Sequence, residues 1–287
     1  MLQQELDSLV PPREFSRRGF VKTAVGSGFA AAVLPVTAQT IKTDSEGLTV
    51  GEVMIPVGDF KMPAYRAQPA GKSGLPVILV VSEIFGVHEH IADVARRFAK
   101  LGYLAIAPEL FVRQGDAQSY GEIAKLISEV ISKVPDAQVM GDLDAAVAWA
   151  KANGGDTSRL GITGFCWGGR TTWMYAAHNP AVKAAVAWYG AVARNNVPGD
   201  KTPLDVAANI KAPVLALYGG ADAGIPNDTI EKMMAALKAA GNAKSELVLY
   251  PDTPHAFHAD YRPSYRKEQA EDGWKRATAW FKAHGVA

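Results

Sequence analysis

The pentapeptide Gly164-Phe165-Cys166-Trp167-Gly168 decides how the rest of this sequence is interpreted. It follows the apolar run 159–163 and precedes a segment with a helical pattern. Glycines placed two residues before and two residues after a strained position let a strand and a helix approach closely. A cysteine at the apex of such a strand, turn and helix is typical of the G-x-nucleophile-x-G turn. We therefore interpret Cys166 as a candidate nucleophile, the alternative being a small buried apolar residue.

Composition predicts one globular domain with a short extension. The chain has 287 residues, of which 48% are hydrophobic and 21% charged, and its net charge is +1. A chain of this length can bury a large core. No dense basic stripe with interleaved aromatic residues is present, so nucleic acid is not an expected partner. One cysteine excludes an intramolecular disulfide, and an unpaired thiol in an oxidising compartment is open to oxidation.

The N-terminal extension predicts export. Ser16-Arg17-Arg18-Gly19-Phe20-Val21-Lys22 carries paired arginines, and the uncharged, weakly apolar stretch 23–36 follows. Small residues at Val36-Thr37-Ala38 favour cleavage before Gln39. Alternatives are an ordinary basic N-terminus or a membrane anchor, but the stretch is too short to span a bilayer of about 30 Å. We expect a twin-arginine signal at 1–38 and one globular domain at 39–287, exported by the twin-arginine machinery to the periplasm or medium without stable membrane insertion.

Apolar patterns predict a sheet covered by helices. Alternation on either side of Val57-Gly58-Asp59 predicts an antiparallel hairpin, and continuous apolar runs predict strands buried on both faces. The predicted strands are 49–56, 61–67, 76–82, 103–107, 159–163, 182–188, 213–218 and 246–250. The predicted helices are 90–101, 120–133, 136–153, 228–240 and 265–284, together with one after the Cys166 turn. Strands that alternate with helices predict a mostly parallel sheet with helices on both faces and an antiparallel N-terminal edge.

Residues directly after the predicted strands form a candidate triad. Ligands bind at the carboxyl ends of strands in such a sheet, where Cys166, Asp222 and His255 all fall. The chain order nucleophile, acid, histidine is that of the α/β-hydrolases, which is the fold we predict. His255 would accept the thiol proton and later protonate the leaving group, while Asp222 fixes its tautomer. Alternatively, Asp222 caps the helix that starts near Pro226, and His255 is an ordinary loop histidine.

The end of the first buried strand supplies further candidates. Backbone N–H groups of Ile84, just after this strand, and of Trp167 are expected to form an oxyanion hole. Glu83 lies between the strand and the apolar pair Ile84 and Phe85, and a carboxylate in that place needs a partner if it is buried. The alternative is a partly exposed loop acid.

Four separated motifs together resemble the dienelactone hydrolases, also called carboxymethylenebutenolidases. They are Val81-Ser82-Glu83-Ile84-Phe85-Gly86, Ala107-Pro108-Glu109-Leu110-Phe111, Gly164 to Gly169 and His255-Ala256-Phe257. The resemblance implies a cofactor-free hydrolase that opens a small lactone through an acyl-cysteine. It also implies that Glu83 contacts the resting thiol and takes its proton once substrate binds. A thiol activated only when the site is occupied is protected from other reactions.

Of the two arginines that bind the substrate carboxylate in the family, this sequence has only one at the expected position. Family members that act on dienelactone hold its carboxylate with two arginines, and Arg113 lies where the first is expected. The second should follow the histidine by four residues, but this sequence has Ala259 there, preceded by His258. Arg262 is close enough along the loop to compensate. Loss of one charged anchor would cost about 1 to 3 kcal/mol for a carboxylate substrate, or else indicates a different substrate.

Aromatic residues near the predicted site have two interpretations. Phe85, Trp167, Tyr189 and Phe257 could line an apolar substrate pocket, or they could belong to the core. We predict that Phe85, Tyr189 and Phe257 bind substrate.

No metal or cofactor is predicted. His88 and His90 flank Glu89 and could suggest a metal site, but no further ligand follows at a suitable spacing. Two alternatives to a lactone hydrolase remain: a broader esterase or thioesterase that uses the same triad, and a periplasmic protein that binds a small acid without catalysis. The intact triad argues against the second, since a protein that only binds would be free to lose it.

Overall fold

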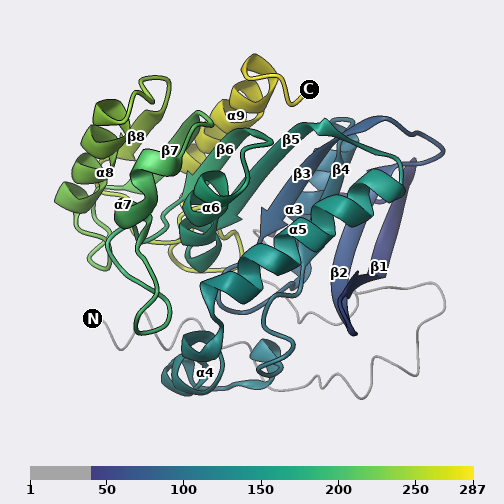
Figure 1. Ribbon diagram of the computed structural model, residues 1–287, viewed down its shortest axis with the longest axis horizontal. Helices are drawn as coiled ribbons and strands as arrows, with labels where there is room; N and C mark the ends of the chain where they lie inside the picture. The colour runs from purple at the N-terminus through teal and green to yellow at the C-terminus, as the bar shows by residue number, and fades with distance from the viewer. Residues whose placement is uncertain (1–39) are drawn as a thin grey trace.

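Eight strands form one sheet at the centre of residues 40–287, which the computed structural model describes (Figure 1). The predicted export signal and its cleavage point lie outside these residues. The strand order is β1-β2-β4-β3-β5-β6-β7-β8. β1 pairs antiparallel with β2 and β2 with β4, whereas all the other neighbours are parallel. The strands are β1 (Leu48–Val57), β2 (Phe60–Pro69), β3 (Leu75–Val81), β4 (Leu104–Pro108), β5 (Gly155–Phe165), β6 (Val182–Trp188), β7 (Val214–Gly219) and β8 (Glu246–Tyr250).

Helices cover both faces of this sheet. On one face, Phe98 of α3 packs against Trp274 and Phe281 of α9, with ring centroids 4.7 and 5.9 Å apart. Figure 1 shows α5 and α6 together in front of the sheet. The α-helices are α3 (Glu89–Lys100), α4 (Ile123–Glu129), α5 (Asp136–Ala152), α6 (Trp167–His178), α7 (Pro203–Val206), α8 (Asn227–Ala239) and α9 (Lys267–Ala283). Short 3₁₀ turns are η2 (Ala117–Ser119), η3 (Ile131–Lys133) and η4 (Ala207–Asn209).

The predicted α/β-hydrolase architecture, with its antiparallel N-terminal edge, is confirmed. β3 is buried along its whole length, as its uninterrupted apolar run indicates. In the hairpin, Ile55 faces Met62 across β1 and β2, and both side chains are fully buried. Each fully buried side chain of this size stabilises the fold by about 1.5 to 3 kcal/mol.

Three elements differ from the prediction. β5 begins at Gly155, earlier than predicted, because Gly155 and Asp156 pair with the start of β3 before a register shift at Pro76. The helix predicted at 120–133 is divided into α4 and η3 at Val130, whose φ and ψ are −121° and −66°. α7 was not predicted, since one turn is too short to show a helical period; a Thr202 capping box begins it.

No helix among residues 40–287 combines the length and apolar character needed to cross a membrane.

Candidate active site

The register of the sheet brings the ends of β3 and β5 side by side. Val81 lies opposite Gly164, so the residues two positions further on, Glu83 and Cys166, leave the sheet as neighbours. At the next strand, the N–H of Cys166 donates to the carbonyl oxygen of Trp188 at 3.0 Å. The predicted nucleophile is therefore fixed between the ends of two other strands.

The turn at Cys166 has the geometry that the glycine spacing predicts. Cys166 has φ 55° and ψ −113°, a conformation that side chains rarely adopt, and its side chain is partly exposed. A Cβ on Gly164 would lie 2.2 Å from the carbonyl oxygen of Gly168. A Cβ on Gly168 would lie 2.3 Å from the carbonyl oxygen of Val81. Only glycine fits at both positions, and the start of α6 is consequently held against the end of β3.

The predicted acid and histidine are in contact. His255 Nδ1 lies 2.5 Å from Asp222 Oδ2, and the Asp222 side chain is 1% exposed while that of His255 is 33% exposed. Burial opposes charging of His255, but its interactions with Cys166 and Asp222 outweigh this and raise its pKa to about 10. The imidazole is thus oriented by a buried carboxylate and favours the protonated form beside a sulfur.

Backbone strain is concentrated at this end of the sheet. The non-glycine residues of 40–287 with positive φ are Cys166, Tyr189, Asp252 and Ala256. Each of them follows the carboxyl end of a strand, and Ala256 is next to His255. Such conformations cost about 1 to 3 kcal/mol each and are found most often at functional sites.

Glu83 is buried and has several partners. Its side chain is 1% exposed, Tyr261 donates its hydroxyl hydrogen to Oε2, and His88 Nε2 lies 3.6 Å from the same oxygen. Burial alone would raise the pKa of Glu83, but the Arg262 charge and His88 outweigh burial and hold it well below its usual range. Oε1 has no hydrogen-bond partner among residues 40–287. Glu83 is therefore not a partly exposed loop acid. Its Oε1 remains available to accept a hydrogen bond or a proton.

Sequence reasoning missed Tyr261 and His88 as partners of Glu83. Both lie in loops that follow strands, His88 after β3 and Tyr261 after β8. The rule that singled out His255 would have included them, but nothing in the sequence indicates that the two loops meet.

A buried acid fixes the loop that carries Ile84, a predicted oxyanion donor. The N–H of Val87 donates to Glu109 Oε2 at 3.0 Å. Gly86 has φ 73°, and a Cβ there would lie 2.4 Å from Glu109 Oε1. Glu109 thereby occupies the space that a side chain at Gly86 would need, and the turn after Ile84 is held in one conformation.

Trp167, the other predicted oxyanion donor, begins α6 and is held through its side chain. Its indole N–H donates to Asn196 Oδ1 at 2.9 Å, and its ring lies 4.7 Å from that of Phe111. The Asn196 amide also donates to the carbonyl oxygens of Ile131 at 3.1 Å and Val134 at 2.7 Å. One side chain thus ties the start of α6 to the segment around η3.

Arg113, the predicted first anchor, has a partner within the chain. Its two terminal nitrogens lie 2.6 and 2.7 Å from the carboxylate oxygens of Asp142, whose side chain is 1% exposed. The guanidinium also lies 4.2 Å from the ring centroid of Phe60. To hold a substrate, Arg113 would have to leave a buried carboxylate unpaired, which is costly.

Arg262 is better placed than Arg113 to bind an acidic group of a substrate. It is 8% exposed, its guanidinium lies 5.0 Å from the ring centroid of Phe85, and its Nε has no partner among the described residues. Burial would lower the pKa of Arg262, but Tyr261, Glu83 and Cys166 outweigh burial and raise it. The guanidinium is therefore a permanent cation close enough to Cys166 to interact with it.

Two predicted substrate-binding aromatics occupy different environments. The ring of Tyr189 lies 5.1 Å from that of His255, and its buried hydroxyl has no partner within residues 40–287. Phe257 is fully buried and packs against Trp188 and Tyr189 at 6.0 and 5.2 Å. These contacts favour the site interpretation for Tyr189 and the core interpretation for Phe257.

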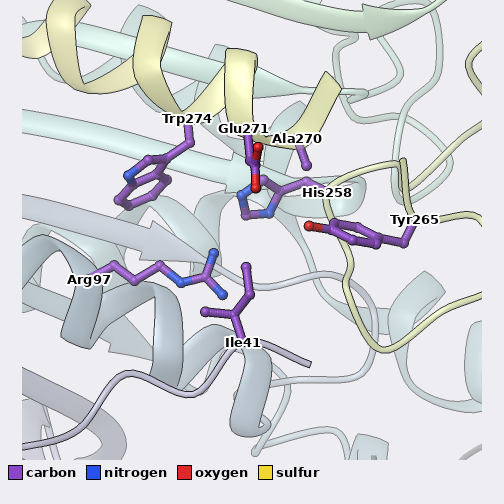
Figure 2. A pocket seen from close by; sticks show the side chains of 7 residues that line it. All are labelled: Ile41, Arg97, His258, Tyr265, Ala270, Glu271 and Trp274. Carbon is purple, nitrogen blue, oxygen red and sulfur yellow. The ribbon is translucent and has the colours of Figure 1, made fainter. Parts of the chain in front are cut away.

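His258 faces a hollow whose lining includes none of the predicted triad residues. Its ring lies 4.5 Å from that of Trp188, and burial lowers its pKa well below the usual value. An uncharged imidazole cannot replace a missing arginine, so Arg262 is the better candidate. The hollow has a volume of about 230 Å³, and Figure 2 shows Arg97 and Tyr265 pointing into it with His258. It is lined by Ile41, Arg97, His258, Tyr265, Ala270, Glu271 and Trp274.

Within residues 40–287, no group of three or more His, Cys, Asp or Glu side chains is placed to hold a metal ion. His88 contacts Glu83, while His90 Nδ1 lies 2.9 Å from Asp260 Oδ1.

Comparison with known proteins identifies the family and agrees with the fold. Residues 62–285 match the dienelactone hydrolase family. A "Putative carboxymethylenebutenolidase" of Methylorubrum extorquens is 62% identical over 286 residues, which cover 99% of this chain and 98% of that one. An Escherichia coli protein of the same name is 53% identical over 265 residues, with 92% and 97% covered. The crystal structure of a "Putative Dienelactone Hydrolase" from Klebsiella pneumoniae has 56% identity and a TM-score of 0.79, and the match covers 82% of this chain and 98% of that one. The protein therefore belongs to the dienelactone hydrolase family and is a hydrolase of the carboxymethylenebutenolidase kind.

Proposed function

We propose that the protein is a cysteine hydrolase that opens a small lactone, or cleaves a related ester, through an acyl-cysteine at Cys166. The observation that carries this proposal is the contact between His255 and the buried Asp222, next to a cysteine on a strained turn. The His255 ring is partly exposed and therefore accessible to substrate, while its Nδ1 is held by Asp222. This is the arrangement that nucleophilic catalysis requires.

In the first half of the proposed reaction, the thiol proton passes to Glu83 Oε1, and the thiolate, beside a protonated His255, attacks the substrate carbonyl carbon. Negative charge develops on the carbonyl oxygen, where the N–H groups of Ile84 and Trp167 would stabilise it. The ring C–O bond then breaks, and His255 gives its proton to the leaving oxygen. The product of this half is a thioester with Cys166.

In the second half, His255 accepts a proton from water and the hydroxide attacks the thioester carbonyl. The C–S bond breaks, the thiolate recovers its proton from Glu83, His255 is again protonated, and a carboxylic acid leaves. No external oxidant, reductant or metal is needed to balance either half.

Glu83 would control when the thiol is activated. Its Oε2 is stabilised by Tyr261 and faces His88, so at rest the carboxylate is a weak base and the thiol keeps its proton. A substrate that alters these contacts would raise the proton affinity of the carboxylate. The unpartnered Oε1 is then the atom available to the thiol proton.

The anchoring residues favour a substrate with an acidic group. Arg262 is a buried cation with a free Nε beside the site, and Phe85 lies under its guanidinium. Arg113 is held by Asp142, so Arg262 is the residue we propose to bind the substrate carboxylate. The name shared by the curated relatives makes dienelactone the first substrate to test.

The test is hydrolysis of dienelactone and of a neutral p-nitrophenyl ester by residues 39–287, with Cys166→Ala and Glu83→Ala beside the wild type. Turnover of dienelactone that disappears in Cys166→Ala supports the lactonase proposal. Turnover of the neutral ester alone indicates a broader esterase. If neither is hydrolysed, the proposal fails and a binding protein for small acids becomes the better account.

We also infer that the chain is exported by the twin-arginine route to the periplasm and cleaved after Ala38, as the paired Arg17 and Arg18 suggest. Fractionation of cells that express the full chain or Arg17→Lys/Arg18→Lys tests this. Retention of the wild-type protein in the cytoplasm, with an N-terminus before residue 39, would exclude it.

A further inference from the structure

Asp260 is a buried carboxylate that joins three parts of the chain. Its side chain is 1% exposed, and it accepts hydrogen bonds from His90 Nδ1 at 2.9 Å and Arg97 Nη2 at 3.1 Å. It also accepts the backbone N–H of Ile41 at 3.1 Å. His90 and Arg97 belong to α3, whereas Ile41 lies in the segment before β1. Asp260 itself lies in the loop 251–266 between β8 and α9.

This loop also carries the partners of Glu83. Tyr261, which donates to Glu83 Oε2, and Arg262, whose charge acts on the same carboxylate, directly follow Asp260. The predicted base His255 lies earlier in the same loop. An anchor at Asp260 therefore determines the direction in which the next two side chains leave the backbone.

We propose that Asp260 is a positioning residue: by tying the loop 251–266 to α3 and to the segment before β1, it holds the Tyr261 hydroxyl on Glu83. This inference rests on the proposed function, because it assigns Asp260 a role through Glu83 in activating the Cys166 thiol. Asp260 does not act on the substrate itself.

Removing the anchor should change the proton affinity of Glu83. The groups that act on this carboxylate are Tyr261 and Arg262 from the loop 251–266, His88 and His90 from the start of α3, and Tyr189 from the end of β6. A displaced Tyr261 takes away a donor to the ionised form while the site stays buried. Glu83 would then hold a proton at higher pH and withdraw one more readily from the resting thiol.

Asp93 provides a matched control. Its side chain is also 1% exposed, and it binds Arg97 Nε and the backbone N–H of Thr43, both at 2.5 Å. It thus links α3 to the same N-terminal segment and shares Arg97 with Asp260. No hydrogen bond or ion pair described for Asp93 within residues 40–287 involves the loop 251–266. Asp93→Asn removes a comparable buried charge without releasing Tyr261.

The experiment compares Asp260→Asn, Asp93→Asn, Tyr261→Phe and the double variant Asp260→Asn/Tyr261→Phe. Two profiles are measured against pH: kcat/KM, and the rate at which iodoacetamide alkylates Cys166 without substrate. For Asp260→Asn and Tyr261→Phe, we expect the acid limb of kcat/KM to move up by about one pH unit. We expect alkylation near neutral pH to rise about tenfold, because the thiolate fraction follows the same change in proton affinity.

Two results would confirm the positioning role: a double variant no different from the single variants, and an Asp93→Asn protein with wild-type profiles. The inference is overturned if Asp260→Asn behaves like Asp93→Asn, or if the effects of Asp260→Asn and Tyr261→Phe add. Should Asp260→Asn fail to fold, Arg97→Gln, which removes one of the three donors and is not among the groups that act on Glu83, is judged by the same criteria.

The alkylation profile needs no substrate, so the two proposals can fail separately. A wild-type protein that hydrolyses neither test substrate contradicts the proposed function, and alkylation still decides the role of Asp260. An active wild type with an unchanged Asp260→Asn profile contradicts only the positioning role.

Discussion

The guanidinium of Arg113 and the carboxylate of Asp142 form a bidentate ion pair, with nitrogen to oxygen distances of 2.6 and 2.7 Å. Asp142 lies on α5, and its side chain is nearly inaccessible to solvent. Arg113 was expected from its sequence position to bind substrate, but it is already paired with a carboxylate of its own chain.

Arg113→Ala should lower stability without changing substrate affinity. It leaves a buried carboxylate unpaired, which costs about 1 to 3 kcal/mol. Urea unfolding measures this loss, and KM for dienelactone should stay at its wild-type value. Arg113→Ala/Asp142→Ala should recover part of the stability. An increase in KM with unchanged stability would instead show that Arg113 leaves Asp142 to bind substrate.

Arg262→Gln should weaken binding of acidic substrates selectively. Loss of a charged hydrogen bond worth about 1.5 to 3 kcal/mol predicts an increase in KM of about tenfold or more for a carboxylate-bearing lactone. A neutral p-nitrophenyl ester is the internal control, since it has no group for Arg262 to hold. Because Arg262 also lowers the pKa of Glu83, kcat is expected to change for both substrates, and the KM of the acidic substrate is the quantity that reports binding. Equal changes in KM for both substrates would mean that Arg262 does not hold the substrate carboxylate.

Gly168→Ala should disrupt the turn at Cys166. The added Cβ would lie 2.3 Å from a backbone oxygen of β3, and backbone cannot yield as a flexible side chain can. We expect activity to be lost and the melting temperature to fall. Gly141→Ala in α5 is the control, because a Cβ there meets no atom within 4 Å. Alanine should stabilise that helix by up to about 1 kcal/mol. Equal behaviour of the two variants would contradict the close packing of β3 and α6.

The pair of Asp222 and His255 should make stability depend on pH in a defined direction. Cys166 and Asp222 together raise the pKa of His255 to about 10, so the part due to Asp222 stabilises the fold fully below the ordinary histidine value of 6.5. That contribution is lost as the pH rises through about 10. The free energy of unfolding of the wild type minus that of Asp222→Asn should therefore shrink between these limits. A difference that is constant across this range would show that His255 is not charged in the folded protein.

Most of the fold could be predicted from local patterns. Uninterrupted apolar runs such as the one in β3 mark buried parallel strands, and Val57-Gly58-Asp59 marks the turn of the hairpin. The position of the predicted triad also follows from local sequence, because Cys166, Asp222 and His255 each come just after a strand. Strand ends lie at one edge of a parallel sheet whatever the strand order.

The partners of the site residues could not be predicted, because they depend on which loops meet. Arg113 and Asp142 are brought together by the packing of α5, and nothing in either segment indicates the other. Tyr261 and Glu83 likewise come from loops after β8 and β3, which are not neighbouring strands. The glycine spacing around Cys166 was informative because it reports steric contacts within one continuous segment.

The proposed mechanism requires that Cys166 becomes acylated during turnover, and mass spectrometry of acid-quenched reactions can detect this acyl group. With a slowly hydrolysed p-nitrophenyl ester, we expect a transient adduct of the acyl group on the peptide that contains Cys166, and no adduct in Cys166→Ala. His255→Gln should slow both its formation and its decay. Turnover that continues in Cys166→Ala, with no acyl group on the wild-type peptide at any time, would exclude Cys166 as the nucleophile.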